Sequence, residues 1–110
     1  MYKYQPPTGE TLRQKQSRFV LMVADLINYA RSGNFELTFG DAYRENNTLC
    51  HGMRLAIDFN LFVDGKYCHA TEWHAALGGY WEFLSPDARW GGRFKQPDGN
   101  HYSLTHEGKS

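Results

Sequence analysis

The 110-residue sequence has no surplus of charge of either sign, because twelve lysines and arginines balance twelve aspartates and glutamates. Proteins that bind nucleic acid or anionic membranes rely on clustered excess cations, since lysine and arginine neutralise the phosphate groups. A neutral chain gives no electrostatic reason to expect such a partner. The sequence therefore predicts no binding to nucleic acid.

Cysteine is also scarce, with Cys50 and Cys68 the two in the chain. Two cysteines cannot form a disulfide framework, and they are too few for a zinc site built on cysteine. One disulfide bridge is possible, but two free thiols are the simpler expectation for a protein of a reducing compartment.

Long hydrophobic runs are missing as well. The N-terminal segment MYKYQPPTGETLRQKQ contains no apolar core of the kind that a secretory signal needs. No other segment approaches the roughly 20 apolar residues that span a bilayer. The sequence therefore predicts a cytoplasmic protein without membrane insertion, which meets an extracellular target only if another factor releases it.

The residues that are present indicate one globular domain over 1–110. Apolar residues make up 41% of the chain, which is enough for one modest core at this length. Residues 1–9 contain Pro6, Pro7 and Gly9 and predict an extended lead-in, and residues 105–110 form a polar tail. We expect a monomer, because no repeat, linker or dedicated binding module is visible.

Hydrophobic periodicity predicts an α+β fold. The first half of the chain is expected to supply one helix and two strands. A first helix is indicated by apolar residues at helical spacing, namely Phe19, Val23, Leu26, Ile27 and Ala30. Arg18 is expected to lie off this apolar stripe, and Gly33 to take the left-handed conformation that follows a helix. Alternating residues predict strands at 35–39 and 55–61, with a loop at 40–50.

The second half of the chain is expected to add a hairpin strand, a second helix and two short strands. Asp64-Gly65 predicts a hairpin that pairs residues 66–68 back onto the preceding strand. Thr71 is suited to cap a second helix, which Ser85-Pro86 ends. Its expected apolar face comprises Trp73, Leu77, Tyr80, Trp81 and Leu84. With short strands at 90–94 and 101–104, the chain predicts a small antiparallel sheet packed with two main helices.

Asp58 is chemically unusual because it interrupts the most apolar strand of the chain. Alternation directs it away from the face that carries Ile57 and Phe59. A carboxylate in the middle of a sheet is costly unless it is paired, hydrogen-bonded or bound to a metal ion. The plainer alternative is a solvated sheet face, which antiparallel sheets often have. Asp58 alone favours that alternative.

Two histidines extend this observation to a possible metal site. His51 lies just before the strand of Asp58, and His101 lies on the last predicted strand. Two imidazoles and one carboxylate form a recurrent zinc set of the catalytic type, with a fourth position open. Such a site needs a further carboxylate to accept a proton. Asp98, in the turn before His101, is the candidate, although Asp-Gly is an ordinary turn dipeptide and the spacing is a weak signal.

The other candidates have plainer interpretations beside the functional ones. Arg44, in the loop after the first strand, suits binding of a substrate carboxylate or an oxyanion, but most single loop arginines are simply solvated. His69 and His74 lie in the ligand-like segment CHATEWH. We expect a structural role for both, with His74 at the surface of its helix or half-buried.

Three runs together resemble the family of zinc D-Ala-D-Ala carboxypeptidases and L-alanyl-D-glutamate endopeptidases, which shares its fold with the Hedgehog signalling domain. The runs are FGDAYR, CHGMRLAIDFNLF and WGGRFKQPDGNHYSL. The resemblance covers nearly the whole chain and is strongest to small phage-encoded members, including endolysins. It implies a Hedgehog/DD-peptidase fold and one zinc ion.

The resemblance implies roles for five residues. His51, Asp58 and His101 match the three metal ligands of the family, Asp98 matches its acidic catalytic residue, and Arg44 matches the arginine that contacts the substrate and the oxyanion. The implied reaction is hydrolysis of a peptide bond next to a D-residue in a peptidoglycan stem peptide. Asp98 would take and then return the proton. The sequence leaves open which stem-peptide bond is cut.

The sequence also departs from the family pattern. Only ENNTLC separates Arg44 from His51, where many relatives carry a longer insert that lines the cleft. Cys50 directly precedes His51 and, as a thiolate, would compete for the metal ion. The short loop keeps a second hypothesis open, a non-catalytic zinc-stabilised module that binds the cell wall or belongs to a phage particle. A third hypothesis is a small interaction domain with a solvated sheet face.

Overall fold

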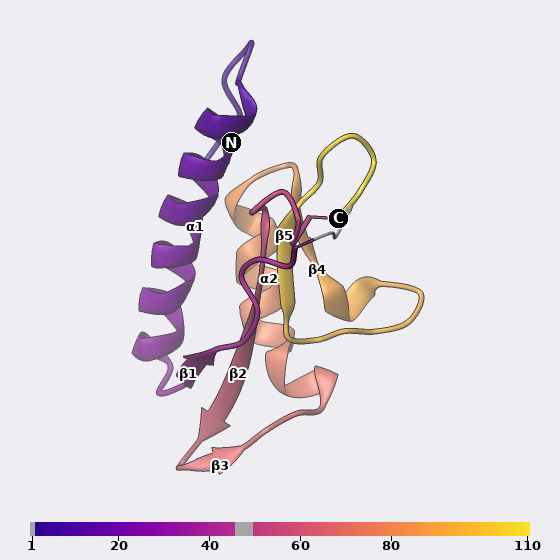
Figure 1. The fold of residues 1–110 in the computed structure, drawn as a ribbon. Coiled ribbons are helices and arrows are strands. Elements are labelled where there is room, and N and C mark those ends of the chain that lie inside the picture. The colour runs from indigo at the N-terminus through magenta and orange to yellow at the C-terminus, as the bar shows by residue number, and fades with distance from the viewer. Residues whose placement is uncertain (1, 46–49) are drawn as a thin grey trace.

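The computed structural model describes residues 2–45 and 50–110. The elements are α1 Leu12–Ser32, β1 Glu36–Phe39, β2 Ala56–Val63, β3 Lys66–Tyr67, the 3₁₀ turn η1 Thr71–His74, α2 Ala75–Leu84, β4 Ala88–Trp90, the 3₁₀ turn η2 Gly91–Arg93 and β5 His101–Leu104. The predicted α+β class, with a small antiparallel sheet and two main helices, is confirmed (Figure 1). Residues 46–49 of the predicted loop lie outside the described residues. No helix within the described residues combines the length and apolar character that crossing a membrane requires.

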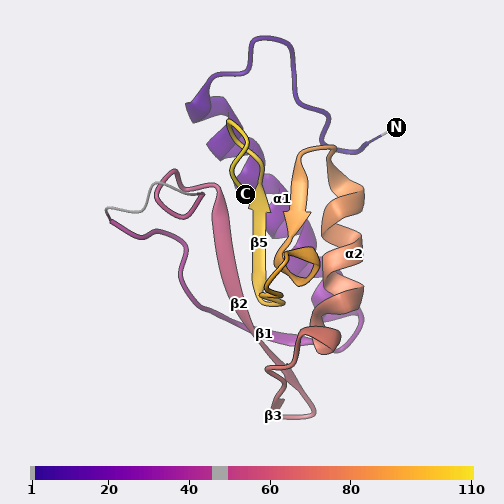
Figure 2. The same cartoon turned by 90° about the vertical axis from the view of Figure 1, so that its right-hand side faces the viewer.

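The sheet is built around β2, its longest strand. β1 pairs with the second half of β2 and β5 with the first half, so the strand order is β1-β2-β5-β4, with β3 beside β2. Figure 2 shows β2 and β5 running side by side. The register sets Asp58 opposite His101 and Ile57 opposite Tyr102. Because side chains alternate along a strand, these two pairs lie on opposite faces of the sheet.

Both helices cover the face that carries Ile57 and Tyr102. Phe19 of α1 meets Trp81 of α2 edge-on, with ring centroids 5.6 Å apart, and Trp81 packs on Tyr102 at 6.1 Å. Fully buried aliphatic side chains fill the space around them, namely Met22, Leu26, Leu61, Leu77, Leu84 and Leu104. Burial of this apolar surface is the main stabilising contribution to the fold.

The ends of α1 are fixed by local hydrogen bonds. Thr11 accepts a hydrogen bond from the Gln14 N–H, and the Gln14 side chain accepts one from the Thr11 N–H. This capping box satisfies two donors at the helix start. At the other end the prediction for Gly33 is wrong by one residue. Gly33 has φ −94°, and Asn34 takes the left-handed conformation with φ 62°, which asparagine tolerates better than most residues.

Arg18 is buried, so the expectation that it lies off the apolar stripe is wrong. Its guanidinium donates to Glu10 at 2.8 Å, to Asp87 at 2.7 Å and to Ser85 at 2.9 Å. Burial alone would raise the pKa of Asp87, but the hydrogen bonds from Arg18 and Ser85 outweigh it and hold this pKa below its ordinary value. These bonds tie the lead-in, α1 and the turn after α2 together.

The second helix begins later than predicted, because the four residues from Thr71 form a 3₁₀ turn without a side-chain cap and α2 starts at Ala75. This shift exposes Trp73 instead of placing it on the apolar face. It also buries His74, which is 1% exposed rather than half-buried. His74 Nδ1 lies 2.7 Å from the Tyr102 hydroxyl oxygen, and burial lowers the pKa of His74 to about 4.

The last predicted strands are confirmed at 101–104 and displaced at 90–94. β4 ends at Trp90, because Gly91 and Gly92 turn the chain back under the indole ring. A Cβ atom at Gly92 would lie 2.2 Å from that ring, and one at Gly78 of α2 would lie 2.1 Å from it. The two cysteines, Cys50 and Cys68, are free thiols, as expected.

We predict that Arg18→Met lowers the free energy of unfolding by about 3–5 kcal/mol, because it leaves the Glu10 and Asp87 carboxylates without their buried partner. Arg13→Met is the matched control, since Arg13 is exposed and, within the described part of the chain, its one side-chain hydrogen bond is to Ser17 on the same helix. It should cost no more than about 0.5 kcal/mol. Urea unfolding monitored by tryptophan fluorescence measures both values, and equal losses would contradict the assigned role of Arg18.

We also predict that stability falls as the pH is lowered from about 6.5 to about 4, because the buried His74 titrates at about 4 in the folded protein and near 6.5 when unfolded. The unfolded state binds more protons in this window, so His74 contributes a loss of roughly 3 kcal/mol. The His74→Phe/Tyr102→Phe double variant removes the histidine together with its hydroxyl partner. In the presence of a chelator its unfolding free energy should depend less on pH, and an unchanged slope would contradict the assignment.

Candidate metal centre

The sheet face opposite the helices is buried around Asp58. Asp58 is 7% exposed, and Ser103 on the same face is fully covered. The alternative of a wet sheet face around Asp58 is therefore wrong. A carboxylate buried to this degree requires compensating partners.

Three side chains converge on this face. His51 Nε2 lies 3.2 Å from Asp58 Oδ1, and His101 Nδ1 lies 3.4 Å from the same oxygen. All three residues are buried, and one donor atom from each lies within 4.8 Å of the others. Ligands that surround a zinc ion tetrahedrally at about 2.0–2.1 Å are roughly 3.4 Å apart. The three residues can therefore hold one metal ion with little rearrangement.

Unsatisfied polar atoms mark the same place. Among the described residues, Asp58 Oδ1, His51 Nδ1 and His101 Nε2 are buried and make no hydrogen bond. Buried polar atoms without partners are rare because they lose their hydration without compensation. A cation bound by Asp58 Oδ1 and one nitrogen of each imidazole would supply the missing partner of the carboxylate oxygen. Burial alone would raise the pKa of Asp58, but the two imidazoles hold it far below its ordinary value.

Strand register and one turn position the three side chains. Asp58 and His101 are direct partners of an antiparallel pair, which brings their Cβ atoms to about 5 Å. His51 comes from the turn before β2. This turn is closed by hydrogen bonds from Met53 N–H to the carbonyl oxygen of Cys50 and from Leu55 N–H to the same oxygen, at 3.2 and 2.8 Å.

An irregularity in the pairing next to Asp58 brings Arg44 to the centre. Gly40 N–H donates to the Asp58 carbonyl at 2.7 Å, while Asp58 N–H donates to the Asp41 carbonyl at 2.9 Å. Gly40 and Asp41 thus face the single residue Asp58, as in a β-bulge, and such bulges redirect the chain beside functional sites. The redirected Arg44 donates to Asp58 Oδ2 at 3.2 Å and to Asp41 Oδ2 at 2.8 Å. Its side chain remains 47% exposed, so it can also contact a ligand.

Asp98 is held beside His101 by close packing against Gly91. Asp98 N–H donates to the Gly91 carbonyl at 2.8 Å, and His101 N–H donates to the Asp98 carbonyl at 3.1 Å. A Cβ atom at Gly91 would lie 2.1 Å from the Asp98 carbonyl oxygen, so only glycine permits this approach. Trp90 Nε1 fixes the same turn by donating to the Gly99 carbonyl at 2.7 Å.

A pocket of about 160 Å³ opens at this centre. Its wall includes Arg44, His51, Asp98 and His101, and Asp58 contacts His51, His101 and Arg44. The structure thus brings together all the residues that the sequence suggested as ligands or catalytic groups. The pocket combines a candidate metal site, an exposed carboxylate and a guanidinium, which is a set suited to acid–base and electrostatic catalysis.

Two features of the pocket are not apparent from the sequence. The tail folds back through a bridge between His106 and Lys109, and Ser110 reaches the pocket wall. Cys50 also lines the pocket, but its thiol donates to the carbonyl oxygens of Leu104 and Lys109, at 3.1 and 3.3 Å. Burial raises the pKa of the Cys50 thiol. The Cys50 thiol is thus engaged by the tail, whereas a ligand to the metal ion would have to be a thiolate.

The chain was compared with models of protein families, with curated proteins and with solved structures, and nothing matched. The chemical interpretation of the centre therefore rests on its residues and their geometry.

We predict that the protein binds one equivalent of a divalent metal ion such as Zn²⁺. Asp58→Asn and His101→Ala should weaken binding by more than about 100-fold, since loss of an outer-shell partner alone costs about 10–100-fold. His69→Ala is the matched control, because His69 is exposed and outside the group. Competition with a chromophoric chelator measures the affinities. A wild-type protein that takes up no metal, or a His69→Ala variant that loses it, would contradict the assignment.

Proposed function

We propose that the chain is a zinc-dependent peptidase of the Hedgehog/DD-peptidase fold that hydrolyses peptide bonds in peptidoglycan stem peptides, acting as a phage lysis enzyme. One observation carries this proposal. His51, Asp58 and His101 converge as buried donors in a pocket that Arg44 and Asp98 also line. A purely structural metal site would need neither the opening nor the additional charged residues.

The donor set favours zinc over other common metal ions. Two imidazole nitrogens with one carboxylate oxygen suit zinc, whereas calcium and magnesium prefer sites made of oxygen alone. Three protein ligands leave a fourth position, and here the pocket lies beside them. When bound, zinc supplies Lewis-acid chemistry, because it polarises a carbonyl group and lowers the pKa of water.

The protein's own groups would supply proton transfer and charge stabilisation. The Asp98 carboxylate is exposed to the pocket, so it can accept the proton of the attacking water and return it to the leaving amine. Arg44 is held at the centre by Asp58. Its guanidinium can stabilise the oxyanion that develops on the scissile carbonyl, or bind a substrate carboxylate.

The substrate class is supported by the motifs FGDAYR, CHGMRLAIDFNLF and WGGRFKQPDGNHYSL and by the size of the pocket. A volume of about 160 Å³ admits small side chains such as those of alanine, which occur throughout stem peptides. Both L-alanyl-D-glutamate endopeptidase and D-Ala-D-Ala carboxypeptidase activity fit this description. Such an enzyme would be made in the cytoplasm and would reach the cell wall only when another factor releases it.

A second candidate is a non-catalytic module of the same fold that keeps zinc for stability. The short segment between Arg44 and His51 favours it, because a segment at this place can contribute to a substrate cleft. Zinc binding is common to both candidates, so turnover is the property that separates them.

We predict that zinc-loaded protein releases new stem-peptide ends from purified peptidoglycan, detected by mass spectrometry. Asp98→Ala should lower the rate by about 10²–10⁴-fold, which is the usual contribution of a general base. Asp98 lies outside the three-residue ligand group, so the variant should retain zinc, and zinc content is the internal control. Absence of cleavage by folded, zinc-loaded wild-type protein would favour the non-catalytic module. Full activity of Asp98→Ala would remove Asp98 from the mechanism.

A further inference from the structure

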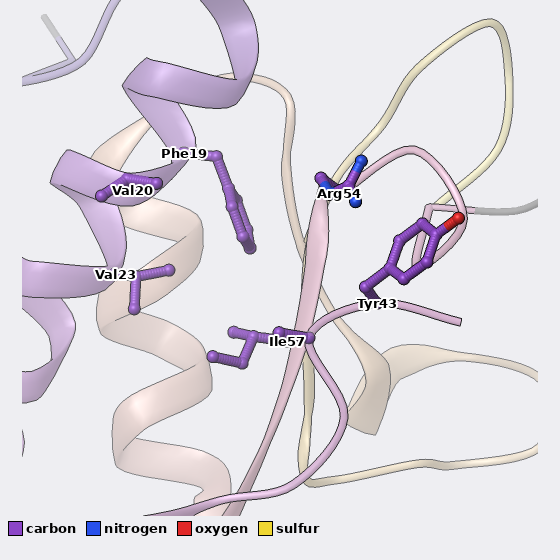
Figure 3. Close-up of a pocket in the computed structure, with 7 residues that line it drawn as sticks. Phe19, Val20, Val23, Tyr43, Arg54 and Ile57 are labelled. Carbon is purple, nitrogen blue, oxygen red and sulfur yellow. The ribbon is translucent and has the colours of Figure 1, made fainter. Parts of the chain in front are cut away.

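A second pocket lies on the helix-covered side of the sheet. It has a volume of about 240 Å³, is open at its rim and is lined by residues of α1, of β2 and of the segments before Arg44 and before β2. Figure 3 shows Phe19, Val23 and Ile57 on one side of this space and Tyr43 and Arg54 on the other. Among the residues that the structure describes, none lines both this pocket and the pocket at the metal centre. The two are therefore separate sites.

The wall of this pocket is almost entirely apolar, since its α1 and β2 side chains are hydrocarbon groups. Water gains little in such a space, because it finds few polar partners there. An apolar cavity of about 150 Å³ is large enough to bind benzene. A pocket of about 240 Å³ therefore has room for an aromatic ring with a short chain, and burying that ring would be favourable.

Arg54 is the charged residue of the wall. Its guanidinium carbon lies 4.2 Å from the centroid of the Tyr43 ring. Within residues 2–45 and 50–110 it forms no ion pair with a carboxylate, whereas Arg44 binds Asp41 and Asp58. An arginine at the edge of an apolar pocket, without an acidic partner of its own, is complementary to an anionic group on an apolar ligand.

The backbone holds Arg54 at this edge. Its φ angle is 57°, a left-handed conformation that is uncommon for residues other than glycine. Its N–H donates to the His51 carbonyl at 3.3 Å, and the preceding Met53 carbonyl accepts a hydrogen bond from Gln16 Nε2 of α1 at 2.9 Å. Unfavourable backbone conformations persist where the surrounding structure enforces them, often at ligand sites.

We propose that this pocket binds a small apolar carboxylate, with its aromatic or aliphatic body between Phe19, Val23 and Ile57 and its carboxylate on Arg54. A free acid and the C-terminal apolar residue of a peptide share this chemistry. The site is independent of the proposed peptidase activity. It nevertheless adjoins the centre, because Tyr43 precedes Arg44 and Arg54 belongs to the turn that begins at His51.

Four probes test the site by calorimetry and by amide NMR shifts of the full chain. They are 4-phenylbutyrate, its neutral amide, N-acetyl-phenylalanine and the amide of N-acetyl-phenylalanine. The carboxylates should bind about tenfold more tightly than their amides, because a charge-assisted hydrogen bond contributes more than a neutral one. Shifts should concentrate at Val23, Tyr43 and Arg54. Tighter binding of N-acetyl-phenylalanine would identify a peptide C-terminus as the source, and tighter binding of phenylbutyrate a free acid.

Variants test the contribution of Arg54 and that of the apolar wall separately. Arg54→Gln should reduce carboxylate affinity to that of the amide and leave amide affinity unchanged, and Arg54→Gly serves the same purpose if the glutamine variant does not fold. Val20→Trp places a large ring at the pocket rim, where Val20 is 63% exposed, and should abolish binding of all four probes. Arg13→Gln, on an exposed position of α1 outside the pocket, is the control and should bind as the wild type does.

Three results would overturn the proposal. The first is no binding of any probe at millimolar concentration. The second is equal affinity for acid and amide, or an unchanged affinity in Arg54→Gln. The third is carboxylate binding that survives Val20→Trp but disappears with Asp58→Asn or with a chelator, because the ligand would then occupy the metal centre.

Discussion

The antiparallel pairing of β2 with β5 is the constraint on which the candidate centre depends. It sets Asp58 opposite His101 on the face that points away from α1 and α2, and a slip of one residue would turn Asp58 towards these helices. Two further features of the backbone position side chains around Asp58 and His101. The bulge at Gly40 and Asp41 brings Arg44 to the carboxylate, and the close approach of Gly91 fixes the turn before His101. Two of the candidate ligands thus come from paired strands, and the other groups come from turns and segments that hydrogen bonds and close packing hold in place.

Burial of the Asp58 carboxylate beside His101 is unfavourable in free energy when no cation lies next to it. The Asp58 carboxylate is almost inaccessible, and one of its oxygens has no hydrogen-bond donor among the described residues. Arg44 compensates the other oxygen from the exposed side. A metal ion between the two imidazoles would offset the remaining cost, and binding of the ion would then be coupled to folding. An apolar pair at these positions would stabilise the sheet more simply, which points to chemistry as the reason for the charge.

Local patterns in the sequence predicted what depends on local structure. Alternation located β1 and β2. The resemblance of three motifs to a peptidase family selected Arg44, His51, Asp58, Asp98 and His101, which the fold brings together. Features that depend on tertiary packing were not predictable. His74 is buried because η1 delays the start of α2, and Arg18 is buried because Glu10 and Asp87 meet it there. Cys50 is buried against the folded-back tail, which raises the pKa of its thiol, and no spacing in the sequence reveals this contact.

X-ray absorption spectroscopy of the zinc-loaded protein tests the central claim most directly, because it reports the atoms bound to the metal. A centre formed by His51, Asp58 and His101 predicts nitrogen and oxygen ligands at about 2.0–2.1 Å, including the scattering pattern of two imidazoles, and no sulfur. A zinc–sulfur distance near 2.3 Å would place Cys50 or Cys68 in the coordination shell. That result would contradict the account of the site given by the β2–β5 pairing.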